Sequence, residues 1–192
     1  LEGCSDNLDA NIMTSSFLEF FAGEEIDKRQ HFYRDSWKIV RDCNIVIGNL
    51  AGRDTETAKG LVSASYAMKG IIYYNLMREF CQPWEENLPG IPLVDNFDID
   101  SRPLRGTMKQ TYEYTEKLFD EALALNPTDK KYIFTTWVIK AYKAKLEFWC
   151  QNWDNVISIC NDIIDNSGYS LTPASDYAAM INAPSEAKGE VL

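Results

Sequence analysis

The chain has 192 residues, which is enough for one domain with a hydrophobic core or for part of a larger one. Its 29 acidic and 19 basic residues give a formal charge of −10, which repels phosphate backbones and anionic lipid surfaces and argues against nucleic acid as a partner. No apolar run approaches the roughly 20 residues that span a bilayer. The aromatic fraction of 12% is high, and we interpret it mainly as core packing, with stacking on flat ligands as the alternative.

The rare reactive residues give little sign of catalysis or of a cofactor. The single histidine, His31, argues against histidine-centred catalysis and against a multi-histidine metal site, and we expect it to be solvated. The five cysteines include no C-x-x-C pair, so we expect free and mostly buried thiols, although Cys150 and Cys160 could meet across a helix pair. Residues 1–4 lack the basic and apolar regions of a signal peptide, so we expect the sequence to begin inside a mature protein.

The first half of the chain is predicted to hold three helices. Residues 5–7 can cap a short helix that ends at Gly23, and a longer helix is expected from about Gln30 to Leu50. The third begins after Thr55 or Thr57 and ends near residue 80. The core-facing side of the second helix is expected to carry Tyr33, Trp37, Val40, Asn44, Ile47 and Leu50, and the third helix carries Leu61, Ala64, Ala67, Met68, Ile71, Ile72, Asn75, Leu76 and Phe80.

Residues 81–105 contain four of the seven prolines, which forbids a continuing helix. This stretch is predicted to be a long extended loop that packs across the helices. It contains Trp84, for which core packing is favoured over stacking on a ligand. Thr107 is a plausible N-cap for a fourth helix that ends before Pro127.

Residues 135–171 predict two antiparallel helices joined by the short polar turn Gln151–Asn152, with the second helix closed by Gly168. Helix pairs of this kind are typical of tetratricopeptide-like repeats, so the predicted fold class is all-α with such pairs and a long Pro-rich loop. The packing positions of the first helix are predicted to be Val138, Ala141, Tyr142, Lys145, Leu146 and Trp149, and those of the second Trp153, Val156, Ile157, Cys160, Ile163 and Ile164.

Motifs of an enzyme are missing. The sequence has no Gly-rich phosphate loop, no H-E-x-x-H and no nucleophile elbow. The carboxylate pairs Glu24–Glu25 and Glu85–Glu86 lie in charged loops, where solvation explains them. We therefore expect a binding protein without catalytic residues, metal or cofactor.

Several segments together carry a family resemblance. They are the line ASYAMKGIIYYNLMREFCQPW, the segment Gly90–Val94, the helix TYEYTEKLFDEALALNP and the helix pair from Thr135 to Leu171. In this order and spacing the chain from Tyr33 to Leu192 resembles the SusD/RagB family of outer-membrane nutrient-binding lipoproteins. The chain departs from the family pattern at Gly70, where the family usually has Ala, and at Cys81, where it usually has Gly.

The resemblance implies a surface-exposed lipoprotein of the outer membrane, attached by a lipid anchor only. It would bind glycans or other nutrients and deliver them to a SusC-like TonB-dependent transporter. Residues 1–192 would then be the N-terminal helical domain of a protein whose second half is absent. The alternatives are a helical-repeat scaffold that binds only protein and, more weakly, an accessory hydrolase. The candidate ligand-binding residues are Asp6, Asn7, Asp9, Asn11 and Trp84.

Overall fold

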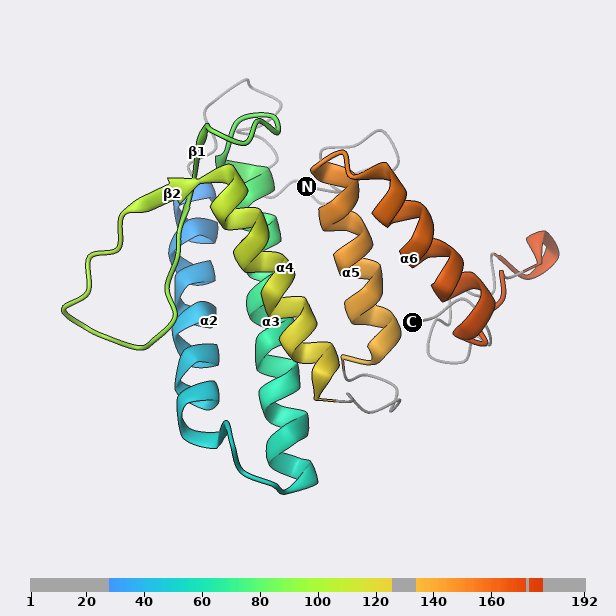
Figure 1. Cartoon of the computed structure of the whole chain (residues 1–192), viewed down its shortest axis with the longest axis horizontal. Coiled ribbons are helices and arrows are strands. Elements are labelled where there is room, and N and C mark those ends of the chain that lie inside the picture. The colour runs from blue at the N-terminus through green and yellow to red at the C-terminus, as the bar shows by residue number, and fades with distance from the viewer. Residues whose placement is uncertain (1–27, 126–133, 172, 178–192) are drawn as a thin grey trace, which may run out of the picture. The chain divides into compact units, whose positions relative to one another are not determined.

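A computed structural model describes residues 28–125, 134–171 and 173–177. They form the helices α2 (Lys28–Leu50), α3 (Glu56–Phe80), α4 (Met108–Ala124), α5 (Thr136–Trp149) and α6 (Trp153–Asn166), the strands β1 (Pro89–Pro92) and β2 (Arg105–Thr107), and one 3₁₀ turn, η2 (Ala174–Asp176) (Figure 1). The all-α class is confirmed. The predicted short helix that ends at Gly23 lies outside the described residues.

The chain divides into two compact units, Leu1–Lys38 and Ile39–Leu192, with the boundary inside α2. The described part of the first unit is the beginning of α2. There the Tyr33 and Trp37 rings meet edge to face with centroids 5.8 Å apart, and Asp35 pairs with Lys38 at 2.8 Å. His31 is exposed, as predicted.

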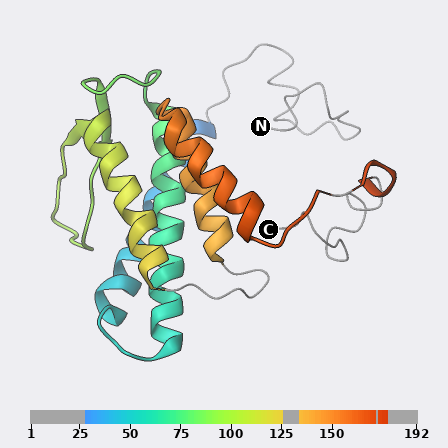
Figure 2. The same ribbon diagram turned by 45° about the vertical axis from the view of Figure 1, so that its right-hand side comes forward.

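In the described part of the second unit, the helices that follow α2 pack on one another in chain order. Helix α3 packs on α4, α4 on α5 and α5 on α6, and Figures 1 and 2 show the same succession from two directions. Gly70 of α3 faces the Phe119 ring of α4 so closely that a Cβ on Gly70 would lie 2.7 Å from a ring carbon. The glycine in place of the usual alanine therefore admits this aromatic ring.

The predicted helix boundaries are largely confirmed because local capping determines them. Thr55, Thr107 and Thr135 each accept a hydrogen bond from a backbone N–H of the first turn. At Thr107 the Gln110 side chain also accepts from the Thr107 backbone N–H, which completes a capping box. Gly168 has φ +75° just after α6, a conformation that glycine adopts without strain.

The Pro-rich segment differs from an irregular loop because it contains the antiparallel pair β1–β2, with Pro89 opposite Thr107 and Pro92 opposite Arg105. Two prolines in four residues argue against a strand, and short edge strands are the exception to that rule. Strand β1 contacts both α3 and α4, and Ile91 is buried. The expectation that this segment packs across the helices is confirmed.

The predicted packing positions of the last two helices are partly wrong. In α5 the buried residues are Ile139, Ala144, Leu146 and Glu147, whereas Lys145 is exposed. Because α5 packs between α4 and α6, its buried surface is not one apolar stripe. In α6 the residues Trp153, Ile157 and Ile164 are exposed. Leu61 of α3 is exposed as well.

The described cysteines carry free thiols, as expected. Cys150 and Cys160, which could have met across the helix pair, form no disulfide. Cys43 and Cys150 are buried. Burial raises the pKa of the Cys43 thiol to about 11, so this group stays protonated at neutral pH.

Candidate functional site

The segment that follows β1 is held against the helices by side-chain hydroxyls. The Tyr73 hydroxyl donates to the carbonyl of Pro92 at 3.0 Å and accepts from the Val94 N–H at 2.9 Å. The Tyr114 hydroxyl donates to the Val94 carbonyl at 3.0 Å, and the Asn44 side-chain amide donates to the same carbonyl at 3.2 Å. An extended backbone is thereby fixed to α2, α3 and α4, and Asn44 is buried on the core-facing side of α2, as expected.

A buried lysine lies beside this attachment. Lys69 is 2% exposed, and its ammonium group lies 5.2 Å from the centroid of the Tyr114 ring. Burial lowers the pKa of Lys69 to about 8, and the carboxylate of Asp95 partly opposes this shift. Burial also raises the pKa of Tyr114, so its hydroxyl remains a donor to the Val94 carbonyl.

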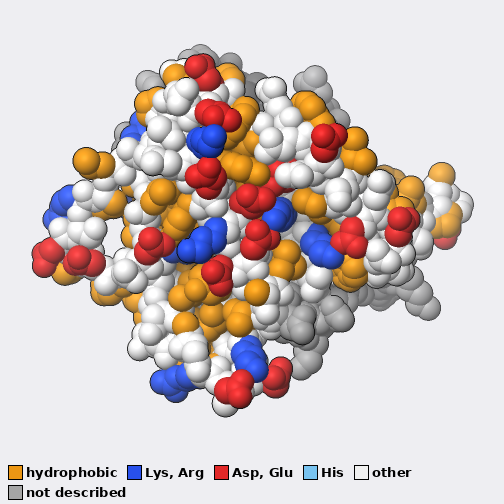
Figure 3. Space-filling model, in the orientation of Figure 1, with side chains coloured by type: hydrophobic (Ala, Val, Ile, Leu, Met, Phe, Trp, Pro, Cys, Tyr) orange, Lys and Arg blue, Asp and Glu red, His pale blue; other side chains and the backbone are white. Residues whose placement is uncertain are grey.

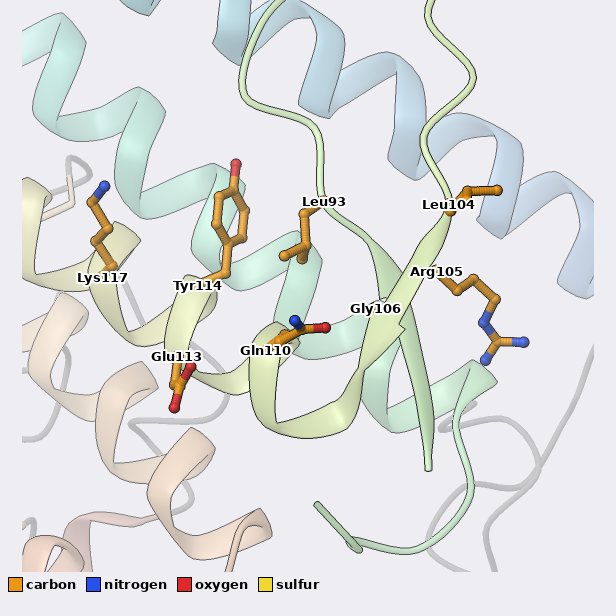
Figure 4. Close-up of a pocket in the computed structure, with 8 residues that line it drawn as sticks. All are labelled: Leu93, Leu104, Arg105, Gly106, Gln110, Glu113, Tyr114 and Lys117. Atoms are coloured by element: carbon orange, nitrogen blue, oxygen red, sulfur yellow. The ribbon is translucent and has the colours of Figure 1, made fainter. Parts of the chain in front are cut away.

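A hollow of about 420 Å³ opens between this segment and α4 (Figure 4). The hollow is shallow and open to solvent. Figure 4 shows the Leu93 side chain beside the Tyr114 ring, whereas the Arg105 side chain points away from them. The residues that line the hollow are Leu93, Leu104, Arg105, Gly106, Gln110, Glu113, Tyr114 and Lys117.

Most polar groups of the hollow already have partners inside the protein. Arg105 donates to the carbonyls of Gly90 and Pro89, at 2.7 and 3.2 Å, and Gln110 belongs to the capping box of α4. In the described part of the chain, Glu113 and Lys117 make no hydrogen bond or ion pair and are exposed. They are the two side chains of the hollow whose charged ends remain open to a ligand.

A second hollow, of about 370 Å³, continues along α4 from Glu113. It is lined by acidic side chains, among them Glu116 and Asp120, and both pair with Lys143 of α5, at 3.4 and 2.6 Å. Figure 3 shows acidic and basic side chains intermixed on this face. The acidic surface is therefore partly neutralised from within, and it is not a free anionic cluster.

The predicted binding residue Trp84 lies in an aromatic group and is half-buried. Its ring meets Tyr112 of α4 edge to face at 5.8 Å and Trp149 of α5 at 6.0 Å. These two ring contacts indicate that Trp84 fastens the Pro-rich segment to α4 and α5. The other predicted binding residues, Asp6, Asn7, Asp9 and Asn11, lie outside the described residues.

A fully buried carboxylate, which the sequence analysis missed, stands next to this aromatic group. Glu147 accepts hydrogen bonds from the Tyr112 hydroxyl at 3.0 and 3.1 Å, from the Asn152 amide at 2.9 Å and from the Asn155 amide at 3.2 Å. Burial, together with the Glu147 carboxylate, raises the pKa of Tyr112, so the tyrosine keeps its proton and donates. The signal in the sequence was the pair of asparagines that follows Glu147 in the turn and at the start of α6.

The described residues offer no group of three or more His, Cys, Asp or Glu side chains that could hold a metal ion. None of the helices in the described ranges has the length and apolar character needed to cross a membrane. The Glu85–Glu86 pair is exposed, as predicted, and Glu86 pairs with Lys109 at 3.1 Å.

The helices α3 to α6 run antiparallel one after another, and the Pro-rich segment is hydrogen-bonded across them (Figure 1). This arrangement defines a tetratricopeptide-like helical protein. The chain belongs to the SusD-like family, because the model of a family described as "starch-binding associating with outer membrane" matches residues 3–148. No functionally curated protein matches the sequence. The family predicted from the sequence is thus confirmed.

Solved structures show the same fold. A SusD superfamily protein from Bacteroides thetaiotaomicron matches with a TM-score of 0.74 at 18% identity, over 88% of this chain and 41% of that one. A protein from Bacteroides vulgatus described as a putative sugar-binding protein matches with 0.68 at 19% identity, over 76% and 36%. One described as a laminarin-binding SusD-like protein matches with 0.65 at 16% identity, over 79% and 34%. The chain therefore spans less than half the length of these proteins.

Proposed function

We propose that this chain is the N-terminal helical part of a longer cell-surface protein that binds glycans without catalysing a reaction. The observation that carries the proposal is the match of residues 3–148 to a family described as starch-binding. The fold shared with a laminarin-binding SusD-like protein supports the same ligand class. By the family resemblance, the protein is a lipid-anchored outer-membrane protein that passes its ligand to a TonB-dependent transporter.

The hollow beside α4 has chemistry suited to a sugar. A pyranose ring presents an apolar face and a rim of hydroxyls, and it is bound by apolar or aromatic side chains together with a few polar groups. Leu93 and Tyr114 supply the apolar wall, and Glu113 and Lys117 supply the open polar groups. We include this hollow among the candidate sites with Trp84 and the residues Asp6, Asn7, Asp9 and Asn11.

The test is the affinity of the full-length protein for a panel of soluble polysaccharides and oligosaccharides, measured by isothermal titration calorimetry. Asp6→Ala, Trp84→Ala and a Glu113→Ala/Lys117→Ala double variant are compared with Asp165→Asn, an exposed change on α6 that should leave binding unaltered. Because Trp84 packs on two aromatic rings, Trp84→Phe is added to separate loss of a ligand contact from loss of packing.

Each outcome assigns a role. Weaker binding in any of the first three variants, with an unchanged melting temperature, places part of the groove in this chain. Binding that survives all of them places the groove elsewhere in the longer protein and retires these candidates. No binding to any glycan of the panel contradicts the proposal and favours the protein-binding scaffold. Delivery to a transporter is tested separately, by co-purification with the product of a neighbouring transporter gene.

A further inference from the structure

Helix α2 carries a buried polar atom that has no partner among the described residues. Asn44 is 4% exposed, and its oxygen Oδ1 accepts no hydrogen bond from them. The orientation of the amide is fixed, because its Nδ2 donates to the Val94 carbonyl and a flipped amide would place two acceptors against each other. A buried polar atom without a hydrogen bond costs free energy, and most such atoms in folded proteins have a partner. A donor is therefore expected at Asn44 Oδ1.

Lys69 of α3 presents the complementary group. Its ammonium group has three N–H donors, and within the described chain it makes no hydrogen bond or ion pair. The contact that it does make is with the Tyr114 ring, 5.2 Å from the ring centroid. The carboxylate of Asp95 acts on it from beyond ion-pair distance and is exposed. An ammonium group that is 2% exposed needs an acceptor as much as Asn44 Oδ1 needs a donor.

The two groups border the same part of the core. The Val94 carbonyl accepts from both Asn44 and Tyr114, at 3.2 and 3.0 Å. The ring of the same tyrosine lies beside the Lys69 ammonium group. On the side of α2, burial raises the pKa of the Cys43 thiol and the charge of Lys69 opposes this shift, so the ammonium group lies near the helical turn that carries Asn44.

The chemistry of the two groups selects the molecule that can join them. A cation would be repelled by the ammonium group of Lys69, and an anion would face the lone pairs of Asn44 Oδ1. A hydroxyl group suits both, because its oxygen accepts from an ammonium group while its proton is donated to an amide oxygen. The exposed fractions of 2% and 4% leave no opening for a sugar or another large hydroxyl compound. We propose that one buried water molecule bridges Lys69 Nζ and Asn44 Oδ1.

The bridging water links α2 to α3 behind the segment that follows β1. A water that joins two polar groups is nearly as favourable in enthalpy as a direct hydrogen bond, and two partners are sufficient to hold it. It fixes the Asn44 amide, which in turn holds the Val94 carbonyl. It also gives the buried charge of Lys69 an acceptor. The site is independent of glycan binding, so it stands or falls apart from the proposed function.

The test joins a crystal structure of the full-length protein, at a resolution that defines water molecules, with a double-mutant cycle. Asn44→Leu and Lys69→Met each remove one end of the bridge and keep a side chain of similar size. Because either change alone already breaks the bridge, the melting temperature of the double variant should lie about 2–4 °C above the value obtained by adding the two single shifts. Asn49→Leu, on the exposed side of α2, is the matched control, and its shift should simply add to that of Lys69→Met.

The crystal structure should show a water oxygen within about 3.2 Å of both Lys69 Nζ and Asn44 Oδ1, and this water should be missing from both single variants. Three results would overturn the proposal. The first is a direct hydrogen bond between Lys69 and Asn44, and the second is an ion pair between Lys69 and Asp95 that replaces the bridge. The third is a departure from additivity no larger than that of the Asn49→Leu control. The wild-type crystal structure decides the question even if a variant fails to fold.

Discussion

The hydrogen-bonded carboxylate of Glu147 offers a quantitative test of how the α5–α6 turn is held. Glu147 is fully buried and receives donors from three side chains that belong to α4, to the turn and to α6. The backbone N–H of Asn152 also donates to the Glu147 carbonyl at 2.9 Å. Replacing this residue therefore removes the group on which three parts of the fold converge.

The size of the effect follows from which donors are left without an acceptor. In Glu147→Ala the Tyr112 hydroxyl and the Asn152 amide lose theirs, at a cost of about 1–3 kcal/mol each, while the exposed Asn155 can turn to water. We expect a loss of about 3–5 kcal/mol in the free energy of unfolding. Glu147→Gln keeps one carbonyl oxygen and the shape of the side chain, so we expect about 1–2 kcal/mol.

The assay is urea unfolding followed by far-ultraviolet circular dichroism, with Glu113→Ala on the exposed side of α4 as the control. The control should change the free energy of unfolding by less than about 0.5 kcal/mol. If Glu147→Ala costs less than about 1 kcal/mol, then the free energy of the lost hydrogen bonds is offset by the desolvation free energy that the buried carboxylate no longer costs. Such a result would contradict the prediction, and Glu147 would be a tolerated rather than a stabilising buried charge.

Two further predictions concern the Pro-rich segment and the lysine beside it. Gly90→Ala should destabilise the protein by about 2–4 kcal/mol, because the added Cβ would lie 2.2 Å from the Thr111 hydroxyl oxygen. Gly60→Ala adds a Cβ with nothing within 4 Å of it, so it should instead stabilise α3 by about 0.5–1 kcal/mol. Thermal unfolding of the two variants distinguishes these effects. Lys69 has a folded-state pKa of about 8, below its ordinary 10.5, so between these values the unfolded state holds more protons and stability rises with pH. Between pH 7 and 10 the wild type should therefore gain on the order of 2 kcal/mol relative to Lys69→Met in urea unfolding, and equal pH profiles would contradict the assignment.

Local signals in the sequence predicted most of the helices. Thr107 followed by Gln110 is a capping-box pattern that needs no tertiary information, and Gly168 marks a helix end for the same local reason. The strands β1 and β2 were missed because their pairing depends on residues far apart in the chain, and because prolines within β1 argue against it. The family resemblance rested on the order of many weak motifs, and the match over residues 3–148 confirmed it.

Helical periodicity predicted which residues are apolar but not which neighbours they find. In α5 the carboxylate of Glu147 is buried because Tyr112 and two asparagines surround it, which no apolar pattern reports. In α6 the row that includes Ile157 was predicted to pack, and it is exposed in this chain. The pattern therefore identified the apolar residues of α6, although some of them lie on a side that α5 does not cover.

The irregular backbone of this protein is fixed by hydroxyl groups that project from rigid helices. Tyr73 and Tyr114 hold the chain after β1, and Tyr112 joins Glu147 beside the α5–α6 turn. A tyrosine suits this task because its ring packs in the core while its hydroxyl reaches the backbone or carboxylate at the edge. Burial raises the pKa of Tyr112 and Tyr114, so both remain donors throughout the neutral range. The hollow beside α4 thus has one wall that is anchored at Val94 by side chains from three helices, so the position of this wall does not depend on a ligand.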